Sequence, residues 1–257
     1  MGSAEINAEF KSRVNSGERI AGIFVKSGSP AMVEIIGYSG FDYALLDMEH
    51  SPVSIEQLEN LIRAAETAGT APMVRVSGIS EPEILHPLDK GAAGLLVPMV
   101  NTPEMAEEVV RYAKYAPQGE RGIDIYARSA KYSTIPKSRY FEQANSSTVI
   151  AVQIEGSEGL ANVAEIAAVE AIDVVYVGPY DLSQSLGIPG QIDDPRVAER
   201  IEKIAADVKA CGKGAGIYVD DVPTALKYFD LGIQFITLSV DATIFLRACE
   251  TLRKELV

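Results

Sequence analysis

Short apolar runs alternate with amphipathic stretches along nearly the whole chain of 257 residues. The runs are continuously apolar, which is typical of parallel strands that are covered by helices. The stretches between them carry helix signals. For example, Ser54 and Gln57 have the spacing of a capping box, and Gly69 supplies the stop. This alternation predicts repeated strand–helix–strand units.

The pattern predicts eight strands and a helix after each of them. Eight such units at this length favour a single-domain α/β fold, a (β/α)8 TIM barrel over residues 1–257, with residues 1–17 as a leading helix or arm. A doubly wound open sheet is the alternative. It usually has a glycine-rich turn after its first strand, and the segment 26–29 has no GxGxxG. The expected strands are 19–26, 43–49, 71–76, 94–100, 149–155, 173–181, 214–220 and 235–241.

The longest irregular stretch covers residues 116–147 and is rich in Gly, Pro, Arg and Tyr. We expect a short helix within it, at 139–144. Loops of this length in a compact domain tend to be functional. We therefore predict that 116–147 is an active-site loop region.

The net charge of −13 narrows the range of partners. No basic run offsets it, so nucleic acid and anionic membrane surfaces are excluded as expected partners. Cys211 and Cys249 have no CxxC spacing and are expected to be free thiols in a reducing compartment. No apolar run has the length of a membrane span, so we expect a cytoplasmic protein.

Polar side chains gather at the carboxyl ends of the predicted strands, where barrels of this kind hold their sites. The opposite ends carry mainly Gly, Ala and Thr, and this asymmetry predicts an enzyme. The polar residues include Asp47, Glu49, His50, Arg75, Gln153, Glu155, Asp181, Asp220 and Asp241.

Two of these carboxylates, Glu155 and Asp181, end neighbouring strands of the predicted sheet. An isolated Asp181 would more often cap the following helix. As a pair, the two carboxylates favour a hard divalent cation that keeps open positions for substrate and water. We expect Asp220, Asp221 and Asp241 to be helix caps.

The remaining polar residues suggest acid–base and charge-stabilising roles. His50 is a candidate general base that Asp47 could orient. Arg75 could equally be a structural partner of Glu49 or a clamp for a substrate carboxylate or developing enolate. Lys26 is the one lysine at a predicted strand end, which disfavours an imine mechanism.

Several segments together resemble the HpcH/HpaI family of class II, metal-dependent pyruvate aldolases, within the phosphoenolpyruvate/pyruvate barrel superfamily. The resemblance implies reversible cleavage of a 4-hydroxy-2-oxo acid to pyruvate and an aldehyde through a metal-stabilised pyruvate enolate. The segments are GFDYALLDMEHSP (40–52), VRV around Arg75, LLVPMV (95–100), YAPQGERG (115–122), VQIE (152–155) and VGPYDLSQSLG (177–187).

The resemblance also implies roles for individual residues. Glu155 and Asp181 resemble the family's ligands for a divalent metal, and oxygen ligands allow Mg, Mn or Co. Arg75 resembles the residue that binds the pyruvyl oxygen and stabilises the enolate. His50 with Asp47 resembles the acid–base dyad that acts on the second substrate.

Further carry-overs concern the pocket and the assembly. Asp89 matches an acidic position that reaches a neighbouring subunit's site. Family members are typically hexamers, trimers of dimers that exchange the last helix, so a homo-oligomer of this kind is expected. The residues expected to line the site or hold the pyruvate carboxylate are Gln153, Gly178, Pro179, Tyr180 and Asp181.

This sequence departs from the family pattern at Tyr180, where the family usually has Ala or Ser. A phenol ring there could narrow the pocket or point away from it. The loop after Arg121 is also more acidic than usual. These differences leave the aldehyde open, and they leave room for an alternative reaction, decarboxylation or other cleavage of a β-keto acid such as oxaloacetate. A silent barrel that only binds a 2-oxo acid is a third hypothesis.

Overall fold

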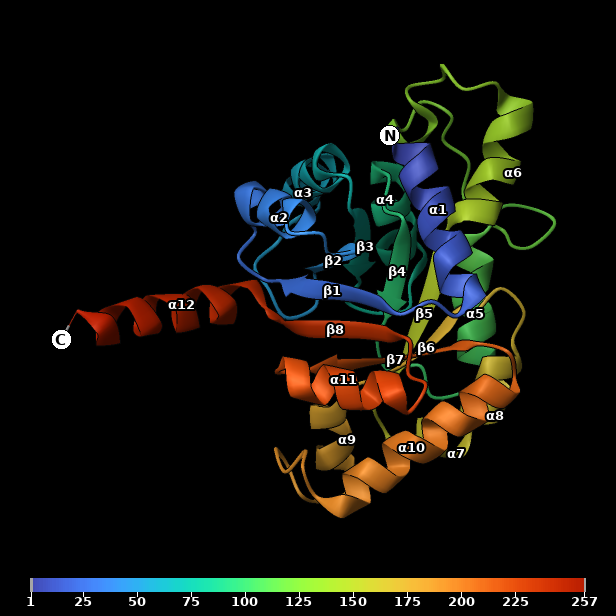
Figure 1. Ribbon diagram of the computed structural model, residues 1–257. Helices are drawn as coiled ribbons and strands as arrows, with labels where there is room; N and C mark the ends of the chain where they lie inside the picture. Colours follow the sequence, from blue (N-terminus) through green and yellow to red (C-terminus); the bar gives the residue numbers. More distant parts are fainter. Residues whose placement is uncertain (1, 257) are drawn as a thin grey trace.

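The computed structural model describes residues 2–256 and contains a closed barrel of parallel strands surrounded by helices (Figure 1). The first strand, β1 (Ile20–Val25), pairs with both β2 (Tyr43–Asp47) and the last strand, β8 (Phe235–Val240). This pairing closes the sheet. It confirms the predicted (β/α)8 barrel and excludes the open doubly wound sheet.

The remaining elements follow in the predicted alternation. The other strands are β3 (Ala71–Arg75), β4 (Gly94–Val97), β5 (Val149–Ile154), β6 (Val174–Val177) and β7 (Gly214–Val219). The helices are α1 (Ser3–Ser16), α2 (Pro30–Tyr38), α3 (Ile55–Ala68), α4 (Glu81–Lys90), α5 (Pro103–Ala113), α6 (Lys137–Ser147), α7 (Ser157–Ala161), α8 (Val163–Ala168), α9 (Pro179–Ser185), α10 (Pro195–Ala210), α11 (Val222–Asp230) and α12 (Asp241–Glu255), with a 3-10 turn η1 (Arg128–Ala130).

The predicted strands run too far at their carboxyl ends. The largest error is in the sixth strand, which ends at Val177 instead of Asp181. Pro179 has no N–H to donate to the sheet, and it starts the unpredicted helix α9 instead. Asp181 therefore lies in the first turn of that helix. The capping box of Ser54 with Gln57 and the stop at Gly69 are confirmed.

Aromatic side chains fill the inside of the barrel. The rings of Tyr43 and Phe235 stack with centroids 4.5 Å apart, and Phe10 of α1 packs on both of them. The buried hydroxyls of Tyr43 and Tyr176 both bond to Thr237, so these polar atoms are satisfied. Helix α1 thus caps the amino-terminal end of the barrel and leaves the carboxyl-terminal end for the site.

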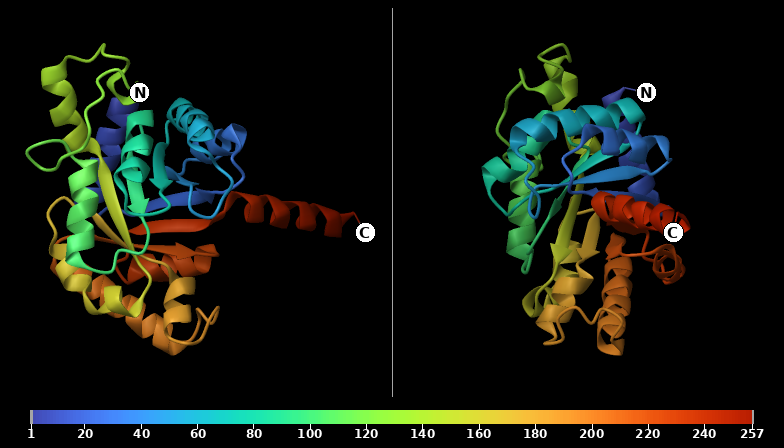
Figure 2. Two further views of the ribbon diagram at one scale, coloured as in Figure 1. Left: turned by 180° about the vertical axis from the view of Figure 1, so that it is seen from behind. Right: turned by 90° about the vertical axis from the view of Figure 1, so that its left-hand side faces the viewer.

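The segment 116–147 joins α5 to β5 and therefore lies at the amino-terminal end of the strands. Its helix α6 packs against α1, and η1 packs against α4 (Figures 1 and 2). The expected helix at 139–144 is present as the longer α6. Within one chain, this segment is at the opposite end from the polar residues that follow the strands.

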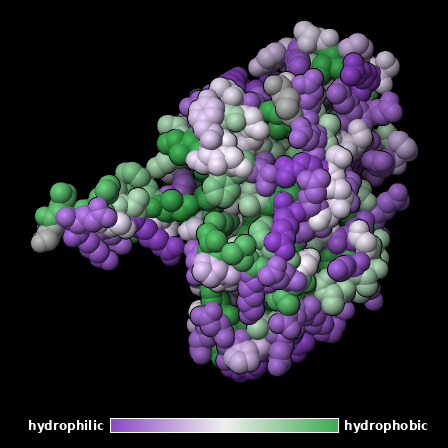
Figure 3. All heavy atoms as spheres, in the orientation of Figure 1, coloured by the Kyte–Doolittle hydropathy of each residue, from purple (hydrophilic) through white to green (hydrophobic). Residues whose placement is uncertain are grey.

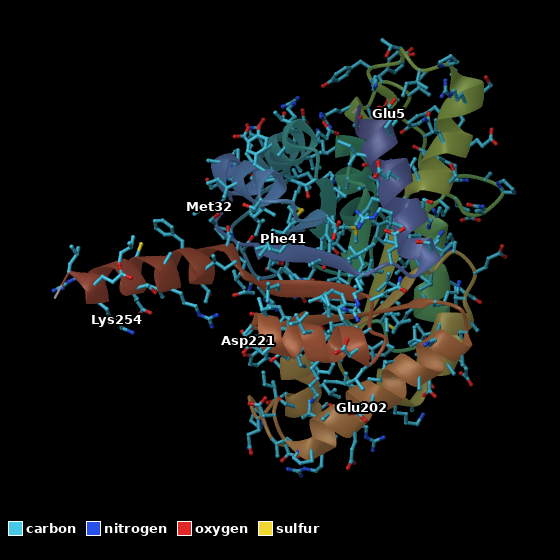
Figure 4. All side chains as sticks on the ribbon, viewed as in Figure 1. Glu5, Met32, Phe41, Glu202, Asp221 and Lys254 are labelled. Carbon is cyan, nitrogen blue, oxygen red and sulfur yellow. The ribbon has the colours of Figure 1, made fainter. Side chains whose placement is uncertain are left out.

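The last helix, α12, leaves the barrel as an isolated arm (Figures 1 and 2). Beyond the root of the helix, most of its side chains project into open space, with Lys254 near the tip (Figure 4). Hydrophobic residues are exposed on it (Figure 3); they are Ile244, Phe245, Leu246, Leu252 and Leu256. Over residues 2–256, none of the helices has both the length and the apolar character needed to cross a membrane.

Lys114 provides a test of the packing at the amino-terminal end. Its ammonium group is buried and donates to the carbonyls of Asn145 and Thr148, and burial lowers the pKa of Lys114 to about 7. Between about pH 7 and 10.5 the unfolded chain keeps this proton and the folded chain releases it, so stability rises with pH. Compared with Lys114→Met, the wild-type unfolding free energy should gain up to about 1.4 kcal/mol per pH unit in urea titrations.

The control for this experiment is Lys131→Met, which removes an exposed lysine of the same charge. A difference for Lys114→Met that is constant over this range would contradict the burial argument.

Candidate active site

The site is built on a buried ion pair between two neighbouring strands. The register of β2 and β3 places Asp47 opposite Arg75. Arg75 donates from Nε and Nη2 to the two carboxylate oxygens of Asp47, each at 2.9 Å. Burial alone would raise the pKa of Asp47, but the hydrogen bonds and charge of Arg75 outweigh it and hold the pKa below its usual value.

Two further groups fix the guanidinium of Arg75. Its Nη1 lies 3.0 Å from Oε2 of Glu49, an ion pair without the alignment of a hydrogen bond. On another side, the ring of Phe24 lies 4.7 Å from the guanidinium carbon, in the cation–π range. The sequence left open whether Arg75 pairs with Glu49 or binds substrate. The structure shows the pairing, and it leaves the substrate role as a prediction.

Lys26 brings a second cation to Asp47. Its Nζ lies 3.5 Å from Oδ2 of Asp47, and its backbone N–H donates to Asp241 at 3.0 Å. Sequence reasoning considered Lys26 only as an imine-forming residue and missed this contact. The strand register could have revealed it, because Val25 lies opposite Leu46 and the next residues are Lys26 and Asp47.

His50 is exposed at the rim of the barrel, and its ring faces Glu49. The distance from Nε2 of His50 to Oε2 of Glu49 is 3.8 Å. Asp47 instead accepts the backbone N–H of His50 at 3.3 Å, and it has no side-chain ion pair with the ring. Asp47 thus shapes the loop that carries His50. The acid–base role of His50 remains a prediction.

Two more carboxylates meet across β5 and α9. A Cβ atom on Gly178 would lie 3.4 Å from Oδ2 of Asp181 and 3.5 Å from Cγ of Glu155, so both side chains flank this glycine. Burial, followed by the charges of Asp181 and Glu49, raises the pKa of Glu155 to about 7. Three acidic groups therefore repel one another here and favour a cation.

The donor set fits a hard divalent cation. Gln153 donates through Nε2 to Glu155, and its buried Oε1 has no hydrogen-bond partner among the described residues. No cluster of three or more His, Cys, Asp or Glu side chains with metal-binding geometry occurs within residues 2–256. Glu155 and Asp181 would thus leave coordination positions open for substrate and water, as a catalytic oxygen site requires.

The other predicted site residues divide between the two ends of the barrel. Gly178 and Pro179 are buried beside the carboxylates, and Tyr180 is 44% exposed, with its hydroxyl 2.7 Å from Asp220. The expected cap role of Asp220 is wrong, because its carboxylate accepts from phenols. Asp221 caps α11 as expected, whereas Asp241 is the first residue of α12 and not its cap. Asp89 lies away from this group and pairs with Arg121 at 2.7 Å.

Comparison with known proteins identifies the family of the chain. Residues 20–248 match the HpcH/HpaI aldolase/citrate lyase family. The chain belongs to this family. The resemblance seen in the sequence is therefore confirmed, and the protein is a carbon–carbon lyase of the aldolase type.

Among its relatives is the 2-keto-3-deoxy-L-rhamnonate aldolase of Escherichia coli (strain K12), which is 37% identical over 95% of this chain and 91% of that protein. A solved HpcH/HpaI family protein from Burkholderia cenocepacia J2315 is 31% identical, with a TM-score of 0.92 over 96% of this chain and 98% of that one. The solved citrate synthase SbnG is 34% identical, with a TM-score of 0.86 over 95% and 96% of the two chains.

Replacing Arg75 with lysine tests the ion pair. The Arg75→Lys variant would keep the charge but lose the two-pronged contact with Asp47, so we expect activity to fall about a hundredfold. The free energy of unfolding should fall by about 2 kcal/mol, because the buried carboxylate loses a hydrogen bond. Pyruvate release and urea unfolding measure the two effects. The exposed Arg63→Lys on α3 is the control, and equal losses in both variants would contradict the role of Arg75.

Proposed function

We propose that this protein is a class II pyruvate aldolase that cleaves a 4-hydroxy acid of the 2-keto-3-deoxy type to pyruvate and an aldehyde. The observation that carries this proposal is the position of Arg75, held between Asp47 and Glu49 beside the carboxylates of Glu155 and Asp181. The relatives named 2-keto-3-deoxy-L-rhamnonate aldolase support the 2-keto-3-deoxy part of this substrate, which becomes pyruvate.

The residues suit each part of a retro-aldol step. A base, for which His50 is the candidate, takes the proton of the C4 hydroxyl, and the C3–C4 bond breaks to release the aldehyde. The electron pair remains on the three-carbon fragment as an enolate, whose oxygen the guanidinium of Arg75 stabilises. A proton then adds to C3 and gives pyruvate.

A divalent cation, Mg, Mn or Co, would be held by Glu155 and Asp181 and would polarise the 2-oxo group as a Lewis acid. Gln153 orients Glu155 through its amide. The turn of Gly178, Pro179 and Tyr180 is the proposed seat of the substrate carboxylate, because it lies directly beside both ligands.

A second candidate is cleavage or decarboxylation of a β-keto acid such as oxaloacetate. It is favoured by Tyr180, which is 44% exposed and stands where the family usually has Ala or Ser. Both reactions pass through the same enolate. Comparing pyruvate release from oxaloacetate and from a 4-hydroxy-2-oxo acid distinguishes them.

We further propose that the protein is a cytoplasmic homo-oligomer, a hexamer made of three dimers that exchange α12. The exposed hydrophobic residues on the isolated arm support exchange, because they have no cover within one chain. The segment 116–147, with its link from Arg121 to Asp89, lies at the amino-terminal end. We propose that this segment serves as an active-site loop by reaching the site of a neighbouring subunit. Asp89 would take part in the same contact.

Proton exchange tests the enolate without knowledge of the aldehyde. In deuterated water with Mg or Mn, the enzyme should exchange the methyl protons of pyruvate, as followed by NMR. EDTA should abolish the exchange, because the Lewis acid is removed. Glu155→Gln should reduce it by about a hundredfold or more, because one ligand is lost.

The control for that experiment is Glu165→Gln on the surface of α8. This variant should exchange the methyl protons of pyruvate at the wild-type rate. Exchange that survives both EDTA and Glu155→Gln would rule out a metal-dependent aldolase.

Charge on the arm tests the assembly. Phe245→Asp should shift the oligomer toward smaller species, because it puts a carboxylate on an apolar face that is 59% exposed at this residue. Sedimentation velocity measures the distribution, and Glu250→Gln on the same helix is the control. A wild-type protein that sediments as a monomer would contradict the exchange.

A further inference from the structure

Three aromatic rings line one side of the barrel mouth. Phe24 at the end of β1 lies 5.9 Å from Tyr218 of β7, and Tyr218 lies 6.1 Å from Tyr180 at the start of α9, measured between ring centroids. We call these three residues the aromatic wall. The residues come from distant parts of the sequence, so the wall is a product of the fold.

Asp220 braces two of these rings. Its Oδ2 accepts from the Tyr180 hydroxyl at 2.7 Å, and its Oδ1 accepts from the Tyr218 hydroxyl at 2.8 Å. Arg247 of α12 donates to the backbone carbonyl of Asp220 at 3.1 Å. Both phenol protons are thus committed to one carboxylate. Tyr180, and in part Tyr218, therefore offer ring surface to a ligand and have no free hydroxyl proton to donate, while Phe24 is buried behind them at 5% exposure.

The wall connects the two halves of the proposed site. At one end, Phe24 lies under the guanidinium of Arg75. At the other end, Tyr180 directly precedes Asp181 and remains 44% exposed although its hydroxyl is bonded. A 2-oxo acid placed between Arg75 and Asp181 has the wall beside it. Arg75 and Asp181 would contact the pyruvate unit, so the wall is left to contact the rest of the substrate, which becomes the aldehyde.

We propose that the aromatic wall determines the aldehyde, and that it selects aldehydes whose substituent is apolar, an aryl or branched alkyl group. This inference rests on the proposed aldolase function and narrows its second product. An apolar substituent loses little on leaving water and gains contact with the rings. A chain of hydroxyl groups would lose its hydrogen bonds to water and find no donor in the wall.

The test uses the reverse reaction, aldol addition of pyruvate to benzaldehyde and to glyceraldehyde, with Mg. The readout is the ratio of kcat/KM for the two aldehydes, because effects on the shared pyruvate half cancel in it. Wild type should favour benzaldehyde, and Tyr180→Ala should lower the ratio by about tenfold or more. Tyr180→Phe should keep the ratio within about threefold, because the ring remains.

A matched control is Tyr112→Ala on α5, which removes a phenol bonded to Glu108 at 2.9 Å in a helix away from the mouth. Its ratio should equal that of wild type. Should Tyr180→Ala fail to fold, Tyr218→Leu tests the neighbouring ring and should also lower the ratio.

Two results would overturn the proposal. One is a wild type that favours glyceraldehyde, and the other is a ratio that is unchanged by removal of either ring. If Tyr180→Phe lowers the ratio of kcat/KM as much as Tyr180→Ala does, the hydroxyl and not the ring sets the preference. That result would also contradict the proposal. Exchange of pyruvate protons by the wild type tests the aldolase function separately. If exchange occurs, the results above concern the aldehyde preference alone. If neither exchange nor aldol product is seen, both proposals are wrong.

Discussion

The rest of the site depends on the burial of one ion pair, that of Asp47 with Arg75. Asp47 has no exposed surface, and Arg75 is 7% exposed. Burying a charge costs free energy unless partners compensate it. Here Phe24, Glu49 and Lys26 surround the pair. Phe24 covers the guanidinium, Glu49 meets its free edge, and Lys26 meets the carboxylate. The need to compensate both buried charges therefore explains how the side chains around Asp47 and Arg75 are arranged.

The charges in the barrel mouth do not balance within the chain. The carboxylates of Asp47, Glu49, Glu155 and Asp181 outnumber the cations of Arg75 and Lys26 around them. The raised pKa values of Glu155 and Glu49 reflect burial together with this excess. A divalent cation bound there would compensate this excess, which supports the proposed metal site.

The barrel could be predicted from the sequence because its evidence is local. Apolar runs, the cap at Ser54 and the stop at Gly69 each act within a few residues. The location of Glu49 and Arg75 at one rim followed from the strand order alone. The placement of Asp181 did not, because the end of β6 depends on Pro179 leaving the sheet. The orientation of Tyr180 depends on Asp220, forty positions away, and periodicity carries no information on such a contact.

The arm formed by α12 is rooted in the site. Asp241, its first residue, accepts the backbone N–H groups of Lys26 and Ser27 at 3.0 and 3.2 Å, and Arg247 holds the backbone at Asp220. The base of the helix is therefore anchored at the rim of the barrel, and the rest of the helix extends away from it. One helix is thus bonded to the loop after β1 and to the loop after β7. In an assembly of the proposed kind, a subunit contact made by the arm would therefore act on the same rim that carries the candidate site.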